Sequence, residues 1–367
     1  MLSEAKGYYQ REQFDESLNS IMKGLKFAPT ASENGEYNRL AACIFLNRGK
    51  LIQARLHAEA ARRHAARSGN LKLIYTTAFT LGNVFSRMNN YSLASQVWRQ
   101  ALKQAEQNND TRIQGRLYLN LALLDQRRGN HKSALEKLKV AMQKMKVAND
   151  KIGEATCYSR MSFYYTEMED YENALIALKS LEKISAEIGN KNLEAVVHFR
   201  RASVHLKKEE FAKAIPELHK SIKLYTILKD NKNAAMAKCD LIRAYIYLGR
   251  TEQADEFLED TIEFIDATGH EACTGALKLV MAEKELIESN ATQAILYYKE
   301  ALDIAESLKD AYRFRAFHES FLAASNRALV DKNVFKELLH TARLGYARFG
   351  LDKQLAEIQE WLEKTPR

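Results

Sequence analysis

The sequence predicts an all-α fold, a right-handed solenoid of about nine antiparallel helix pairs followed by a C-terminal capping helix. Seven alanines stand at steps of forty residues: Ala54, Ala94, Ala134, Ala174, Ala214, Ala254 and Ala294. A fixed period of this length indicates one supersecondary unit that is copied along the chain, so that stacked neighbours bury the apolar surface. The 367 residues include only 3 prolines and 15 glycines, which is few for a sheet protein with many tight turns.

The residues around each marker alanine predict two helices per repeat. Small residues stand twelve positions before most markers, at Ala42, Gly82, Ala122, Ser162, Ala202 and Ala282. Large apolar residues stand four positions after them, at Trp98, Leu138, Leu178, Leu218, Leu258 and Tyr298. Spacings of three, four and seven define one face of a helix. We therefore expect two antiparallel helices that cross closely at the small residues.

Turn residues predict where the helices end. Gly49, Gly129-Asn130 and Gly249 suit a left-handed cap between the two helices of a pair. The second helix is expected to end sixteen residues after the marker, at residues that can also cap the next helix: Asn70, Asp110, Asp150, Asn190, Asp230 and Asp310. The predicted superhelix covers 1–350, with repeats near 1–32, 33–70, 71–110, 111–150, 151–190, 191–230, 231–270, 271–310 and 311–350. A capping helix and tail follow in 351–367, with an apolar face at Leu351, Leu355, Ile358 and Leu362.

The order of small residue, aromatic, turn, alanine, large apolar residue and small residue resembles the tetratricopeptide repeat (TPR). The stretch Asn120-Leu-Ala-Leu-Leu, followed by Gly129-Asn130 and Ala134, is a close match. The forty-residue period is similar to that of kinesin light chains, of spindle-orientation adaptors of the LGN type and of the sensor arms of maltose-activator-type regulators. The resemblance implies a superhelix in which the first helix of each pair lines a concave groove that binds other proteins.

In that geometry the groove residues lie about eighteen, fifteen, fourteen, eleven and seven positions before the marker. The candidate peptide-groove residues are Asn83, Arg87, Arg116, Asn120, Arg127, Arg160, Phe163, Phe199, Arg200, Asp240 and Arg243. Within this set Asn120, Arg160, Arg200 and Asp240 form a ladder with the spacing of the repeat.

The chemistry of the ladder suits a ligand in extended form. The kinesin-light-chain resemblance implies that Asn120 holds peptide backbone, since its amide can both donate and accept. Arginines grip carboxylates bidentately, and the phenylalanines could take apolar side chains. We therefore expect an acidic protein or peptide partner. The alternative is an ordinary solvated face, on which each arginine pairs with a neighbour such as Glu167 or Asp240.

Charge is distributed unevenly along the chain, whose net charge is +8. Residues 51–150 hold 17 Lys and Arg against 6 Asp and Glu, whereas residues 251–300 hold 3 against 12. The basic part could be a nucleic-acid footprint, but no aromatic interleaving or recognition-helix motif accompanies it, so nucleic acid is an unlikely partner. Head-to-tail contact between the basic and acidic parts is a further alternative. The sequence leaves the oligomeric state open.

No motif for catalysis, a cofactor or a metal is found. The sequence has no GxxxxGK[ST], GxGxxG, HExxH or GxSxG, and its nine histidines are scattered. The four cysteines form no CxxC pair and are expected to be buried thiols. There is no apolar run of membrane-spanning length and no signal-peptide pattern. These features predict a cytoplasmic protein that is not an enzyme, needs no cofactor and has no membrane partner.

The leading functional hypothesis is a non-catalytic adaptor that binds an extended acidic segment in its groove. The alternative is a ligand- or peptide-sensing module, either the arm of a larger transcriptional or signalling regulator or a Rap-like peptide receptor. Because no separate helical bundle or helix-turn-helix precedes the repeats, the sequence favours the arm over the stand-alone receptor. A weaker alternative is a nucleic-acid-associated assembly factor.

Overall fold

The computed structural model describes residues 1–11, 13–27, 30–127, 130–308, 311–327, 331–349 and 352–364. Within these ranges the secondary structure consists of nineteen α-helices, with no strand. The prediction of an all-α fold is therefore confirmed. The chain divides into two compact units, unit 1 (Met1–Cys157) and unit 2 (Tyr158–Arg367).

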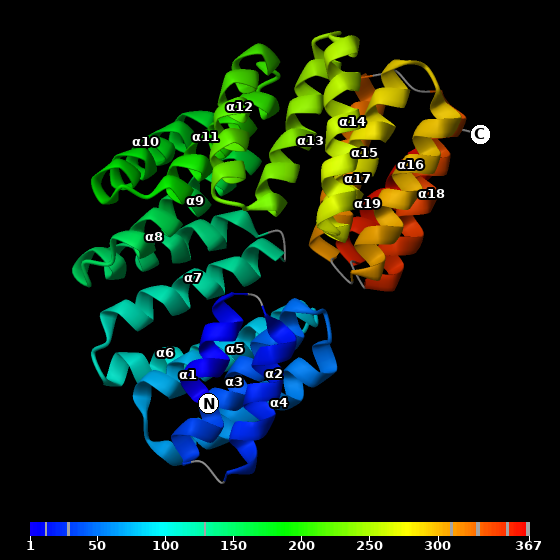
Figure 1. The fold of residues 1–367 in the computed structure, drawn as a ribbon. Helices are drawn as coiled ribbons and strands as arrows, with labels where there is room; N and C mark the ends of the chain where they lie inside the picture. The colour runs from blue at the N-terminus through cyan, green and yellow to red at the C-terminus, as the bar shows by residue number, and fades with distance from the viewer. Residues whose placement is uncertain are drawn as a thin grey trace. The chain divides into compact units, whose positions relative to one another are not determined.

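The helices follow one another in antiparallel pairs within each unit (Figure 1). Unit 1 contains α1 (Leu2–Gln10), α2 (Phe14–Lys26), α3 (Ala31–Asn47), α4 (Leu51–Ser68), α5 (Leu71–Arg87), α6 (Tyr91–Gln107), α7 (Thr111–Arg127) and α8 (His131–Val147). The boundary between the units falls inside α9 (Lys151–Glu167).

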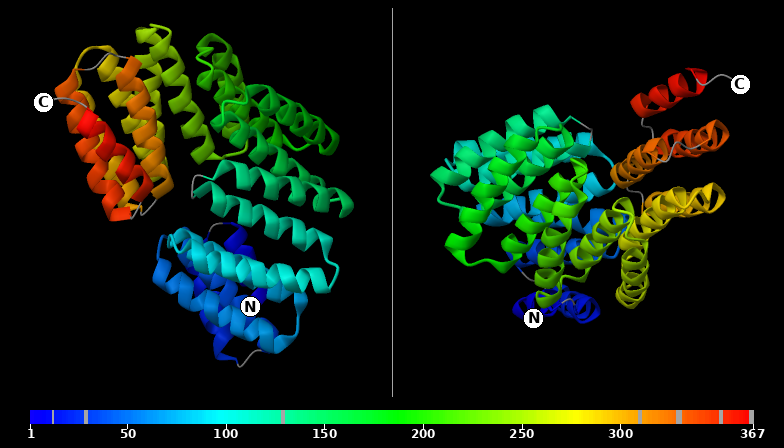
Figure 2. Two further views of the ribbon diagram at one scale, coloured as in Figure 1. Left: turned by 180° about the vertical axis from the view of Figure 1, so that it is seen from behind. Right: turned by 90° about the horizontal axis from the view of Figure 1, so that it is seen from above.

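Unit 2 continues the same alternation, which Figure 2 shows from two further directions. It contains α10 (Tyr171–Ile188), α11 (Lys191–Lys207), α12 (Phe211–Ile227), α13 (Asn231–Tyr247), α14 (Thr251–Thr268), α15 (Glu271–Ile287), α16 (Ala291–Ser307), α17 (Ala311–Arg327), α18 (Lys332–Phe349) and α19 (Asp352–Lys364). The last helix packs against α18, and its Ile358 is buried.

The marker alanines lie where the helices of a pair cross. All seven are completely buried: Ala54, Ala94, Ala134, Ala174, Ala214, Ala254 and Ala294. Gly82, on the facing helix α5, shows why small residues are needed at the crossing, because a Cβ atom there would overlap the buried indole ring of Trp98. At this crossing the helices are packed so closely that position 82 has no room for any side chain.

The turns between repeats follow one recurring geometry. The second helix of a pair ends two or three residues earlier than expected, for example at Ser68 in α4 and at Gln107 in α6. A residue just beyond the helix, such as Gly69 or Asn109, has a positive φ angle. Asn70, Asp110, Asp150, Asn190 and Asp230 then cap the next helix by accepting hydrogen bonds from its backbone N–H groups. Gly129, Asp310 and Leu351 lie outside the described residues.

The cysteines are free thiols, and three of them, Cys157, Cys239 and Cys273, are buried as expected. Cys43 is partly exposed. Within the described ranges, no helix has both the length and the apolar character that crossing a membrane requires.

Candidate functional site

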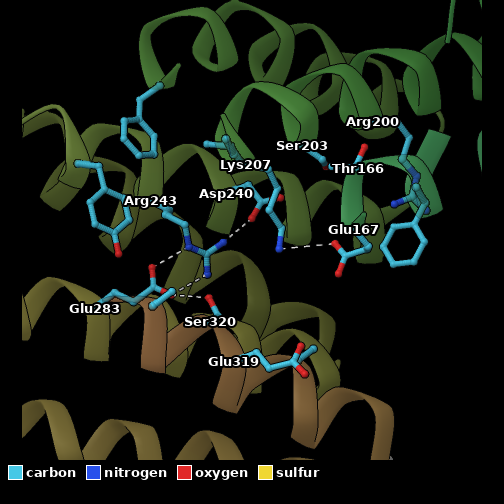
Figure 3. Close-up of a pocket in the computed structure, with 16 residues that line it drawn as sticks. Thr166, Glu167, Arg200, Ser203, Lys207, Asp240, Arg243, Glu283, Glu319 and Ser320 are labelled. Atoms are coloured by element: carbon cyan, nitrogen blue, oxygen red, sulfur yellow. Dashed lines mark hydrogen bonds and ion pairs between the residues drawn. The ribbon is translucent and has the colours of Figure 1, made fainter. Parts of the chain in front are cut away.

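Unit 2 contains a cavity of about 360 Å³ that is lined by the first helices of consecutive pairs. Its lining residues come from α9, α11, α13, α15 and α17, together with one residue of α12. They are Phe163, Thr166, Glu167, Arg200, Ser203, Leu206, Lys207, Phe211, Asp240, Arg243, Tyr247, Glu283, Ala316, Glu319, Ser320 and Ala323 (Figure 3). The repeat thus brings residues from five first helices that lie far apart in the sequence to one surface.

Arg243 is the centre of an ion-pair network in this cavity (Figure 3). Its Nε and Nη2 atoms donate to the two carboxylate oxygens of Glu283 at 2.7 and 3.1 Å, and its Nη1 donates to Asp240 at 2.6 Å. The hydroxyl of Ser320 donates to Glu283 at 3.0 Å. The side chain of Glu283 is only 1% exposed, so its charge depends on these partners.

Burial and charge set the ionisation of this network. Burial raises the pKa of Asp240 above its usual range, because the nearby Arg243 offsets the loss of water only in part. Burial disfavours a charged Arg243, but the carboxylates of Glu283 and Asp240 outweigh this effect and raise its pKa. Arg243 therefore remains a guanidinium held by two acids, and its hydrogen-bond donors are used within the protein.

Two further cations lie in the cavity in a different setting. The guanidinium of Arg200 lies 5.1 Å from the ring centroid of Phe163, close enough for a cation–π interaction. The ammonium of Lys207 lies 3.6 Å from Glu167, and the lysine side chain is 56% exposed. A pair this long and this exposed is weak and exchanges readily with water or a ligand.

The cavity collects four of the predicted groove residues, namely Phe163, Arg200, Asp240 and Arg243. Arg160 lies on α9 and is partly buried, but it is not part of the lining. The ring of Phe199 packs instead at 6.4 Å from that of Tyr225.

The other predicted residues lie on the first helices of unit 1. Asn83 and Arg87 are exposed on α5, whereas Asn120 and Arg127 are partly buried on α7. Arg116 donates from Nη2 to Asp150 at 3.1 Å. Since Asp150 caps α9 through the N–H of Gly153, Arg116 is tied to a helix end in the neighbouring repeat.

Sequence reasoning missed Glu283 and Ser320, which hold the network together. A signal for both was present. Glu283 lies eleven positions before Ala294, just as Arg243 lies eleven positions before Ala254. The spacing that predicts Arg243 as a groove residue therefore also predicts Glu283. Ser320 lies fourteen positions before Val334, which stands forty residues after Ala294 and so takes the place of the marker alanine in the last repeat.

Among the described residues, no three His, Cys, Asp or Glu side chains form a group that could hold a metal ion. The cavity offers hydrogen-bonding groups, the cations of Arg200 and Lys207 and aromatic rings, which are groups that can fix the orientation of a ligand.

Comparison with known proteins identifies the fold. No family model matches the sequence, and no curated protein matches it. Among solved structures, a Rap protein in complex with Competence and Sporulation Factor is similar with a TM-score of 0.64 and 13% identity, over 100% of this chain and 98% of that one. The quorum sensor NprR, solved with its cognate peptide NprX, is similar with a TM-score of 0.54 and 14% identity, over 90% and 98%.

A third structure, a tetratricopeptide repeat protein from Parabacteroides merdae, has a TM-score of 0.52 and 15% identity, and the similarity covers 78% of this chain and 99% of that one. At these identities the likeness concerns the fold. Together with the buried marker alanines and the consecutive helix pairs, it shows that this chain has the fold of the tetratricopeptide-repeat superfamily.

Proposed function

We propose that this protein is a non-catalytic peptide-binding protein that holds a short extended segment of a partner in the cavity of unit 2. The observation that carries the proposal is the convergence of five repeat-related helices on one cavity with charged, hydroxyl and aromatic groups. The Rap and NprR structures support it, because they are described in complex with Competence and Sporulation Factor and with the peptide NprX.

The ligand segment in this proposal carries a carboxylate, either a side chain or a C-terminus. Arg243 is held by Asp240 and Glu283, so it is not the cation that meets the ligand. Arg200 lies against the ring of Phe163, and Lys207 makes a long, exposed pair. A ligand carboxylate that approaches these two cations gains charge-assisted hydrogen bonds without breaking the buried network.

A peptide-sensing regulator is the second candidate function. The likeness to the Rap structure extends over 98% of that chain, and NprR is described as a quorum sensor. The sequence-based preference for the arm of a larger regulator over a stand-alone receptor relied on the N-terminal region. The likeness covers all of this chain and 98% of the Rap chain, so a Rap-like receptor stands beside the arm of a larger regulator as an alternative.

A peptide selection tests the proposed function. A library of random ten-residue peptides is selected against the full chain, and enriched peptides are measured by fluorescence anisotropy. We expect a convergent set of peptides with at least one carboxylate. The double variant Arg200→Ala, Lys207→Ala should weaken their binding at least about tenfold, since each charged hydrogen bond contributes on the order of a tenfold factor.

The matched control removes two lysines, Lys179 and Lys183, that are exposed on α10 and lie outside the cavity lining. The variant Lys179→Ala, Lys183→Ala has the same change in net charge and should bind like the wild type. If no convergent peptides emerge from the wild type, or if both double variants weaken binding equally, the cavity is not the peptide site.

A further inference from the structure

One wall of the cavity is apolar. The rings of Phe211 and Tyr247 stack with centroids 5.1 Å apart and an interplanar angle of 21°, and Leu206 lines the cavity beside them. All three side chains are partly buried. Aromatic and aliphatic surface that stays partly accessible inside a cavity gains free energy when a ligand covers it.

Three of the four residues that helix α17 contributes to the lining are small. Ala316, Ser320 and Ala323 line the cavity and lie eighteen, fourteen and eleven positions before Val334. The positions equivalent to Ser320 and Ala323 hold Arg200 and Ser203 in the repeat of α11, and Asp240 and Arg243 in the repeat of α13. Figure 3 shows the labelled α17 residues Glu319 and Ser320 across the cavity from Arg200. The small residues of α17 therefore leave space in the lining.

The buried ion-pair network does not call for a ligand charge in this space. Glu283 is satisfied by Arg243 and by Ser320, and Arg243 also holds Asp240. A charged ligand group placed against this network would have to break hydrogen bonds that a buried carboxylate requires. An apolar group can fill the same space and leave every one of these bonds in place.

Resting on the function proposed above, we infer that the bound segment carries one bulky apolar side chain, of the Leu, Met, Phe or Trp class. This side chain inserts between the Phe211–Tyr247 stack and the small residues of α17, beside a carboxylate that faces Arg200 and Lys207. The cavity volume of about 360 Å³ is near the lower end of the roughly 300–1,000 Å³ typical of ligand pockets. It therefore suits one side chain with the adjoining backbone of a short segment.

A volume-filling substitution in the full chain tests this inference. A pentapeptide library with all twenty residues at each position is selected against the wild type and against Ala323→Leu. The introduced leucine would occupy the space that the ligand side chain needs. We expect the wild type to enrich peptides that combine an apolar anchor with a carboxylate. Those peptides should bind Ala323→Leu at least about tenfold more weakly, since a buried large apolar side chain contributes a factor of this order or more.

The variant Ala316→Leu provides a second obstruction from the same helix, and Ala267→Leu on α14, where Ala267 is exposed, is the matched control outside the cavity. Circular dichroism confirms that each variant is folded. Two results overturn the inference while the proposed function stands: wild-type enrichment of peptides without an apolar anchor, or unchanged binding of the enriched peptides to both cavity variants. The absence of any enriched peptide overturns the proposed function itself.

Discussion

Two predicted groove arginines, Arg116 in unit 1 and Arg243 in unit 2, lie in different surroundings. In unit 1, the side chain of Arg116 is 51% exposed and pairs with Asp150 at the start of a neighbouring helix. In unit 2, the side chain of Arg243 is 20% exposed and is held by Asp240 and by Glu283, whose side chain is 1% exposed. The repeat places both arginines on a first helix, but only the surrounding repeats decide whether the charge is buried. A basic residue in a groove position is therefore not by itself a ligand contact.

The largest expected effect comes from breaking the buried network in unit 2. Arg243→Ala leaves Glu283 with only the Ser320 hydroxyl among its observed partners. Removing one member of a buried ion pair typically costs about 3–5 kcal/mol, and we expect the free energy of unfolding to fall by about 3 kcal/mol at pH 7. Urea unfolding followed by circular dichroism measures the change.

The triple variant Arg243→Met, Asp240→Asn, Glu283→Gln is the control for this prediction. It removes the arginine together with both of its acidic partners, so most of the lost stability should return. If Arg243→Ala costs less than about 1 kcal/mol, the upper range for an exposed pair, or if the triple variant is no more stable than the single one, the network in unit 2 behaves like an exposed pair. The contrast between the units would then be wrong.

Much of the fold could be predicted because it depends on local rules that recur. The marker alanines are completely buried because the two helices of a pair approach each other closely at these positions, where small residues fit best. The capping residues recur for a similar reason, since each new helix has N–H groups without a partner. The second helix of each pair ends two or three residues earlier than predicted, because a residue with positive φ, such as Asn109 or Asn149, stands before the capping residue.

The site could be predicted only in part, because partners lie one repeat away. Arg243 and Glu283 are forty residues apart, as are Glu167 and Lys207. Opposite charges at the same position of adjacent repeats therefore predict ion pairs between those repeats. No such rule gives the stacking of Phe211 on Tyr247 or the extent of the cavity, which depend on how side chains from several helices fill space.

An effect of similar size, but confined to acid pH, is expected at the C-terminal core of unit 2. His318 is 5% exposed, and its Nδ1 lies 2.6 Å from the hydroxyl oxygen of Tyr298. Burial lowers the pKa of His318 to about 4, whereas an unfolded histidine has a pKa near 6.5. The unfolded chain therefore binds more protons between these values, and stability falls as the pH is lowered from about 6.5 to about 4.

Between about pH 6.5 and about pH 4, protonation of His318 in the unfolded chain should lower the free energy of unfolding by roughly 3 kcal/mol. His318→Gln removes the titrating group, so its stability should change less with pH than that of the wild type. Parallel denaturant titrations at neutral pH and at two mildly acidic values inside the window measure the difference, in which the carboxylates common to both proteins cancel. Equal pH dependence in the two proteins would show that His318 is accessible to protons in the folded state.

The smallest effect is expected for Arg116→Ala in unit 1. Arg116 is half exposed, and Arg112 also lies near Asp150, with its Nε atom 3.5 Å from the carboxylate. Asp150 therefore keeps one cation and its hydrogen bond to the N–H of Gly153 after the substitution. Exposed ion pairs contribute about 0.2–1 kcal/mol, so the free energy of unfolding should fall by less than about 1 kcal/mol in the same urea titration. A loss as large as that of Arg243→Ala would mean that Arg116 and Arg243 stabilise the fold equally, and the exposure of an arginine would then be a poor guide to whether it can meet a ligand.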